Sequence, residues 1–213
     1  SAAAKELGIK PQNMGAVRVI RQALDARGKK RPPRFALTVE VYEPGAFPAP
    51  LWSPPSYRNS PTLPEGEKPL IIGTGPAGLF AAIRLLEYGI TPILIERGKP
   101  VYERSRQTSD FRHRGILDGE SNYCYGEGGA GTFSDGKLYT RKNHPLVRTV
   151  LEWLVAFGAP EFETLVHTRP HVGTNKLIPI ALNIRNSLLS HGAEIRFDTR
   201  MDSLELCSTG GAQ

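Results

Sequence analysis

Cysteine and long hydrophobic runs are scarce in this 213-residue sequence, and both absences exclude structural classes. The two cysteines, Cys124 and Cys207, are too few and too far apart for a disulfide framework or a C-x-x-C redox pair. A reducing compartment, the cytoplasm, is therefore expected. No apolar run approaches the roughly 18 residues of a membrane span, and residues 1–10 lack the apolar part of a signal peptide. A targeting segment removed ahead of residue 1 would leave no trace here.

The positive charge is concentrated at the N-terminal end. The formal net charge is +6, and residues 1–60 hold ten Lys or Arg against four acidic residues. The remaining residues hold seventeen of each sign, so the rest of the chain is neutral. With 39% hydrophobic residues, the chain can bury a core and form one or two domains.

Residues 69–98 read as strand, glycine turn, helix and second strand. The apolar run at residues 70–72 leads into Gly73-Thr-Gly-Pro-Ala-Gly78, which matches G-x-G-x-x-G. In this motif the first glycine makes the turn, the second admits a pyrophosphate, and the third packs helix on strand. Pro76 suits the first helical position, where N–H groups face the ligand. These features predict a dinucleotide site.

Glu96 ends the second strand, eighteen residues beyond the third glycine. A carboxylate at that point accepts hydrogen bonds from an adenosine ribose and disfavours a 2′-phosphate. The glycine motif follows a strand and opens a helix, and the acid ends the next strand, which is the order expected of a dinucleotide-binding unit. The residues expected to bind the cofactor in this stretch are Gly73, Gly75, Pro76, Ala77, Gly78, Glu96 and Arg97.

Three motifs also carry a family resemblance. GTGPAGL followed by ILIERG resembles the FAD-binding start of the glutathione-reductase-like flavoproteins. ESNYCYGEGGAGTFSDGKLYTR and RPHVGTNKL are similar to a narrower group, the NAD(P)/FAD-dependent dehydrogenases. The resemblance implies an FAD-dependent oxidoreductase with a Rossmann-like fold, the flavin as redox centre, and NAD(P)H as a candidate electron donor.

The glycine-rich loop at residues 126–137 would then be a second cofactor loop. It has five glycines in eleven positions, which suits backbone that passes close to a ligand. By resemblance the loop passes the pyrophosphate and runs beneath the flavin ring, with Lys137 near the isoalloxazine. The resemblance also makes Arg104 a candidate ligand contact, and His171, Thr174 and Lys176 candidates for substrate contact or loop positioning. The backbone contacts that it implies are at Gly128, Gly129, Ala130 and Gly131.

Two other chemistries are disfavoured by this loop. The spacing of Gly131, Gly136 and Lys137 nearly matches a nucleoside-triphosphate loop, but Leu138 replaces the hydroxyl residue that binds Mg²⁺. The loop also lacks the cysteine pair of the enzymes that reduce disulfides, so Cys124 is expected to be structural. No metal site is expected either, because His167 and His171 have ligand spacing but no evident third ligand.

Residues 1–43 are expected to form a small basic α+β module. Helices are predicted at residues 2–7 and 15–26, and a strand at residues 34–43. The module is interpreted as a docking subdomain. In a less favoured alternative it binds nucleic acid through a helix-turn-helix-like pattern and the basic run at residues 27–34. The apolar face of the second helix would hold Val17, Ile20 and Leu24.

A proline-rich connector is expected at residues 44–66, pinned where Trp52 and Tyr57 find apolar surface. Residues 67–213 are expected to be the N-terminal part of an FAD-binding domain, truncated because too few strands are present. Helices are predicted from residue 143 to 158 and after Pro179, then a strand at 194–197 and the entry to a hairpin at 208–213.

The sequence thus predicts an α/β fold, an incomplete FAD- or NAD(P)-binding Rossmann-like βαβ unit preceded by the small module. The predicted function is an FAD-dependent oxidoreductase or dehydrogenase acting on a small molecule that the sequence does not identify. The alternatives are an NAD(P)-binding Rossmann enzyme without flavin, and a module that binds nucleic acid or protein through its basic N-terminal segment. No catalytic acid, base or nucleophile is assigned.

Overall fold

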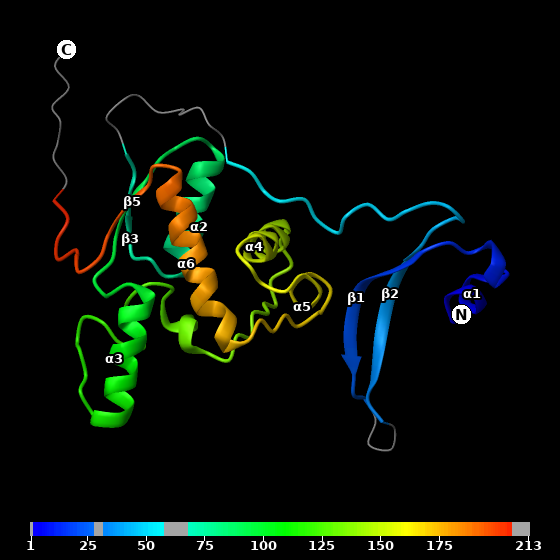
Figure 1. The fold of residues 1–213 in the computed structure, drawn as a ribbon, viewed down its shortest axis with the longest axis horizontal. Helices are drawn as coiled ribbons and strands as arrows, with labels where there is room; N and C mark the ends of the chain where they lie inside the picture. The colour runs from blue at the N-terminus through cyan, green and yellow to red at the C-terminus, as the bar shows by residue number, and fades with distance from the viewer. Residues whose placement is uncertain (1, 28–31, 58–67, 206–213) are drawn as a thin grey trace, which may run out of the picture. The chain divides into compact units, whose positions relative to one another are not determined.

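The computed structural model describes residues 2–27, 32–57 and 68–205. The chain divides into two compact units, and Figure 1 colours it from the N-terminus to the C-terminus. Unit 1 comprises Ser1–Pro55 and Ser134–Ile180, and unit 2 comprises Ser56–Phe133 and Ala181–Gln213. Cys207, the expected hairpin entry at 208–213, and residues 28–31 of the basic run at 27–34 lie outside the described residues.

The division differs in one respect from the domains expected from the sequence. The break between residues 55 and 56 falls inside the expected connector at 44–66. Residues 134–180, however, group with the N-terminal module and not with the rest of residues 67–213. Contacts between segments that are distant in the sequence therefore define the units, and the boundary suggested by composition does not.

Unit 2 contains a three-stranded parallel sheet in the order β3–β4–β5. β3 spans Leu70–Ile72, β4 spans Ile93–Ile95 and β5 spans Glu194–Arg196. Helix α2, Pro76–Glu87, connects β3 to β4, as the sequence predicts (Figure 1). Parallel neighbours need such a crossover connection, and it places the apolar side of the helix against the sheet. The buried residues of α2 and β4 include Leu79, Ala82, Ile83, Leu86 and Leu94.

Two longer helices complete this unit. α3 spans Val101–Arg114, shortly after β4. α6 spans Thr174–Ser190 and continues from unit 1 into unit 2; it contains Pro179, although the sequence predicts a start after this proline. Tyr57 is held by the end of α6, since its hydroxyl lies 3.1 Å from Ser187 Oγ and its ring 4.4 Å from the His191 ring. The connector is thus held at Tyr57 by a hydroxyl and a histidine ring, whereas the sequence predicts an apolar surface.

The predicted helix at residues 15–26 is wrong, because these residues form strand β1, Val17–Asp25. It pairs antiparallel with β2, Arg34–Val41, which the sequence does predict. The register shifts between Val19 and Arg21, where a bulge adds one residue to β1. A bulge changes the phase of the strand's alternation, so apolar residues recur at a spacing that resembles a helix. The helix-turn-helix pattern is therefore wrong as well.

The remaining elements of unit 1 are mostly helical. α1 spans Ala2–Leu7, the 3-10 turn η1 spans Pro11–Asn13, α4 spans Pro145–Ala156 and α5 spans Glu161–Leu165. α4 begins where the sequence predicts, and the His144 side chain caps it by accepting from Leu146 N at 3.2 Å. The backbone of Gln22 in β1 pairs with the segment after α5, through Val166 O at 2.8 Å and Thr168 N at 2.9 Å.

Two glycines cross in unit 1 at van der Waals contact. Lys137 and His171 form an isolated antiparallel bridge, flanked by Val172 N donating to Gly136 O at 2.8 Å. Gly136 has φ +83°, and a Cβ there would lie 2.4 Å from Gly173 N. Since the obstacle is backbone, it cannot rotate away.

We expect Gly136→Ala to lower the free energy of unfolding by at least about 3 kcal/mol, because left-handed strain and a backbone clash act together. Gly45→Ala is the matched control, since Gly45 has φ +85° but nothing within 4 Å of its Cβ position. That change should cost only about 1–2 kcal/mol of left-handed strain. Urea denaturation followed by circular dichroism measures both, and equal losses would show that the crossing is not tight.

Candidate functional site

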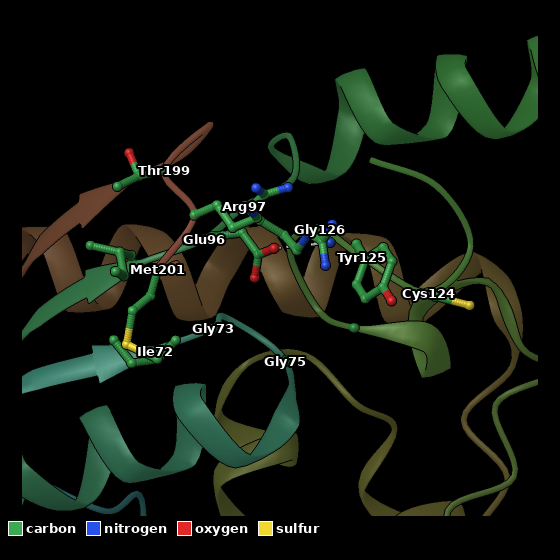
Figure 2. Close-up of a pocket in the computed structure, with 13 residues that line it drawn as sticks. Ile72, Gly73, Gly75, Glu96, Arg97, Cys124, Tyr125, Gly126, Thr199 and Met201 are labelled. Atoms are coloured by element: carbon green, nitrogen blue, oxygen red, sulfur yellow. Dashed lines mark hydrogen bonds between the residues drawn. The ribbon is translucent and has the colours of Figure 1, made fainter. Parts of the chain in front are cut away.

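A pocket of about 340 Å³ lies at the carboxyl ends of β3 and β4 in unit 2 (Figure 2). Its volume is at the small end of the range for ligand pockets, so it suits one part of a long ligand. The lining residues are brought together from segments that are up to 129 residues apart in the sequence, from Ile72 to Met201. The lining residues are Ile72, Gly73, Gly75, Ile95, Glu96, Arg97, Cys124, Tyr125, Gly126, Gly129, Thr199, Arg200 and Met201.

The first glycine loop places the start of α2 beside this pocket. Gly73 N donates to Ile95 O at 2.7 Å, which ties the loop to the end of β4. A Cβ on Gly78 would lie 2.0 Å from Gly73 O, so only glycine allows the helix this close to the loop. Gly75 is the N-cap residue and Pro76 the first helical residue, and no side chain caps the helix. The positive dipole end and N–H groups of α2 therefore remain for an anionic ligand.

Glu96 is 5% exposed and both of its carboxylate oxygens accept two hydrogen bonds. Oε2 accepts from Thr74 N at 2.7 Å and from Thr74 Oγ1 at 2.9 Å. Oε1 accepts from Gly98 N at 2.9 Å and from Gly126 N at 3.1 Å. A carboxylate has about four lone-pair sites, so the protein's own donors fill them. Glu96 lines the pocket, as predicted, and also joins three loops.

The second glycine loop lies against the first. Gly128 N donates to Thr74 O at 2.9 Å, and a Cβ on Gly129 would lie 2.9 Å from Pro76 Cδ. The structure thus brings Gly128 and Gly129 to the amino end of α2. Gly129 lines the pocket, whereas Ala130 and Gly131 lie in the 3-10 turn η2, Ala130–Phe133, away from the lining.

Arg97 forms one wall of the pocket. Its guanidinium carbon lies 3.9 Å from the centroid of the Tyr125 ring, and its Nη2 lies 2.9 Å from Glu120 Oε2. Glu120 also binds Arg200, whose Nη1 lies 2.8 Å from Oε1. The sequence analysis missed Tyr125 and the wall at residues 199–201. The position of Tyr125 directly before the second glycine loop was a usable signal, but nothing local marks residues 199–201.

Arg104 is fully buried and does not reach the pocket. Its guanidinium donates to the carbonyl oxygens of Asn122 at 2.8 Å, Tyr123 at 2.9 Å and Glu127 at 2.6 Å. Burial lowers the pKa of this guanidinium below its usual value. The expected ligand contact is therefore replaced by a structural role, since Arg104 satisfies carbonyl groups at residues 122–127, which lead into the second loop, and has no exposed surface.

Lys137 belongs to unit 1, where its Nζ lies 2.7 Å from Asp135 Oδ2. This partner raises the pKa of Lys137 and lowers the pKa of Asp135. His171 Nε2 lies 2.7 Å from Asp135 O in the same unit. The expectation that Lys137 lies beside a flavin stays a prediction, as do the substrate contacts expected of His171, Thr174 and Lys176.

Cys124 is an exposed free thiol that lines the pocket, so the expectation that it is structural is wrong. Across the described ranges, no group of three or more His, Cys, Asp or Glu side chains is placed to hold a metal ion. Among the helices of the described residues, none is both long and apolar enough to cross a membrane.

Comparison with known proteins bears on the glycine loop and its strands. Residues 68–118 match an FAD binding domain. This match supports FAD as a cofactor, and it does not extend to NAD(P)H. Residues 1–42 match a domain of unknown function, DUF8436.

One relative is an uncharacterized protein from Clostridium beijerinckii, to which the chain is 42% identical over 137 residues. The match covers 64% of this chain but only 26% of the relative, so the chain spans about a quarter of that protein's length. The relative's name assigns it no reaction.

We expect Glu96→Gln to lower the free energy of unfolding by about 3 kcal/mol, because an amide NH₂ would face backbone N–H donors and leave them unpaired. Glu120→Gln is the matched control, since it removes an acidic group of which 48% is exposed. Glu120 makes two exposed ion pairs, with Arg97 and Arg200, and each contributes about 0–1 kcal/mol, so the control should cost less than about 2 kcal/mol. Denaturation in urea measures both variants, and comparable losses would contradict the bridging role of Glu96.

Proposed function

We propose that this chain is the cofactor-binding part of an FAD-dependent oxidoreductase, with β3, α2 and β4 acting as a Rossmann-type dinucleotide unit. The observation that carries the proposal is the start of α2, which has no side-chain cap and lies between two glycine loops in contact. A helix start of this kind suits the pyrophosphate of a dinucleotide. The match of residues 68–118 to an FAD binding domain supports FAD in particular.

The residues at this helix start fit a pyrophosphate. A Cβ on Gly75 would have ordinary contact only, at 3.8 Å from Gly129 Cα, so the protein's own packing does not require a glycine there. A close approach by a ligand does require one. We assign the pyrophosphate to the backbone of Gly75, Ala77, Gly78 and Gly129, with the dipole of α2 adding attraction.

Glu96 is assigned to the adenosine ribose, with one exchange of partners. Its lone pairs are filled, so a ribose hydroxyl must replace a present donor. Gly126 N, at 3.1 Å, makes the longest of the four bonds and lines the pocket, so it is the partner that we assign for replacement. The Arg97–Tyr125 wall then adjoins the adenosine end.

When bound, the flavin would supply the electron transfer, and this chain's residues would bind and orient it. NAD(P)H as electron donor, a small-molecule substrate and a cytoplasmic location remain predictions from the sequence. The nucleic-acid alternative loses its helix-turn-helix pattern, since β1 replaces the second helix. No general acid or base is assigned to any described residue.

The first experiment is a visible absorption spectrum of the purified chain and of the full reading frame, each reconstituted with FAD. We expect bound flavin in the longer protein, because the chain spans only about a quarter of its relative. Anaerobic addition of NADH or NADPH then tests the electron donor by bleaching of the flavin band. Absence of bound FAD from both forms would contradict the proposal.

Gly75→Ala separates cofactor binding from stability. The added methyl group has room in the ligand-free protein but would occupy the path of the pyrophosphate. We expect FAD affinity to fall at least about thirtyfold while the unfolding free energy changes by less than about 0.5 kcal/mol. Gly119→Ala, with nothing within 4 Å of its Cβ position, is the control and should leave FAD affinity unchanged. Equal affinity in both variants would place the pyrophosphate elsewhere.

A further inference from the structure

Glu127 lies between Gly126 and Gly129, which both line the pocket, yet Glu127 itself does not. It is 1% exposed, so the side chain points into the protein. The resemblance and the glycine motif assign it no role. Burial of a carboxylate costs free energy unless hydrogen bonds or an ion pair compensate for the lost water. The partners of Glu127 therefore indicate its role.

The carboxylate of Glu127 takes the place of a cap on α3. The N-cap residue of this helix is Pro100, and no side chain near it caps the helix. Glu127 Oε2 accepts from Val101 N at 2.6 Å, across 26 residues of sequence. An acidic group at this end of a helix is stabilised by the unpaired N–H groups and the dipole.

The same oxygen also ties the loop to α6. Arg185 Nη1 lies 2.9 Å from Glu127 Oε2, and the Arg185 side chain is 17% exposed. Oε1 has no hydrogen-bond partner in the described part of the chain. Burial raises the pKa of Glu127, against the opposing effects of Val101 N–H, Arg185 and Arg104. The bonds from Val101 N and Arg185 Nη1 both need an acceptor oxygen at Oε2, and a neutral Glu127 side chain can also offer one.

The backbone of Glu127 is fixed as firmly as its side chain. Its N–H donates to Lys99 O at 3.1 Å, and its carbonyl accepts from Arg104 Nη1 at 2.6 Å. On either side, Gly126 N reaches Glu96 and Gly128 N reaches Thr74 O. A displacement of Glu127 would shift both neighbours, since they are joined to it by single peptide units.

We propose that Glu127 is a positioning residue of the cofactor site, which holds the second glycine loop against the first through the acceptor oxygen that it offers to α3 and α6. Its effect on the cofactor rests on the proposed FAD function. Its effect on the loop does not.

Two substitutions of similar size separate this role from simple burial. Glu127→Gln keeps a carbonyl oxygen for Val101 N and Arg185, whereas Glu127→Leu fills the space and leaves both donors unpaired. In Glu127→Leu we expect the Gly128 amide to exchange hydrogen at least about tenfold faster and FAD affinity to fall at least about tenfold. In Glu127→Gln both quantities should stay within about threefold of the wild type.

Leu86→Ala in α2 controls for general loss of stability. Leu86 is 3% exposed and lies in the last turn of α2, at the end opposite to Gly75, so its truncation lowers global stability and removes no hydrogen bond of either glycine loop. All variants are compared at a temperature where circular dichroism shows them folded. Unchanged FAD affinity in Leu86→Ala beside a loss in Glu127→Leu supports the proposal, and an equal loss in both overturns it.

The two measurements keep this proposal apart from the proposed function. If the wild type binds FAD but Glu127→Leu binds it equally well, the positioning role is wrong and the flavoprotein stands. If no form binds FAD, the proposed function is wrong and hydrogen exchange at Gly128 still decides whether Glu127 positions the loop. Exchange unchanged by Glu127→Leu would overturn the positioning role in either case.

Discussion

The hydrogen bonds of one buried carboxylate join the segments that surround the pocket. Glu96 receives its four donors from the first glycine loop, the turn after β4 and the second glycine loop. Hydrogen bonds to an ionised group are stronger than neutral ones, and burial protects them from competing water. Gly128 N also donates to Thr74 O at 2.9 Å, so the two glycine loops are joined at a second point beside this junction. A short strand that ends in an acid thus organises loops from three parts of the chain.

Side-chain polar groups stabilise the second loop where regular secondary structure does not. Arg104 donates hydrogen bonds to three backbone carbonyl groups in and just before this loop. Glu127, within the loop, accepts a hydrogen bond from the first backbone N–H of α3. Glycine-rich backbone loses much conformational entropy when it folds. Buried, well-directed hydrogen bonds offset that loss, and they hold the loop in one shape near the amino end of α2.

The parts of the fold that could be predicted depend on local sequence. Apolar periodicity and three glycines identified β3, α2 and β4 correctly, because each signal lies within a few residues of the structure it specifies. The prediction of a helix at residues 15–26 was wrong, because a bulge at Ile20 shifts the alternation of apolar residues along β1 and gives it a helix-like spacing. The burial of Arg104 and the pocket wall at residues 199–201 could not be predicted, because their partners are distant in the sequence and become neighbours only on folding.

The crossing of Gly136 and Gly173 limits how the two specific motifs of unit 1 can vary. A larger residue in a packed core is often accommodated by a smaller one opposite, but here both partners already lack a side chain and the contact is with backbone. No substitution at position 173 can make room for a side chain at position 136, because the obstacle is the backbone of Gly173. Homologous chains that keep this crossing must therefore keep glycine at position 136, whereas position 173 is limited by its own left-handed φ of +86°.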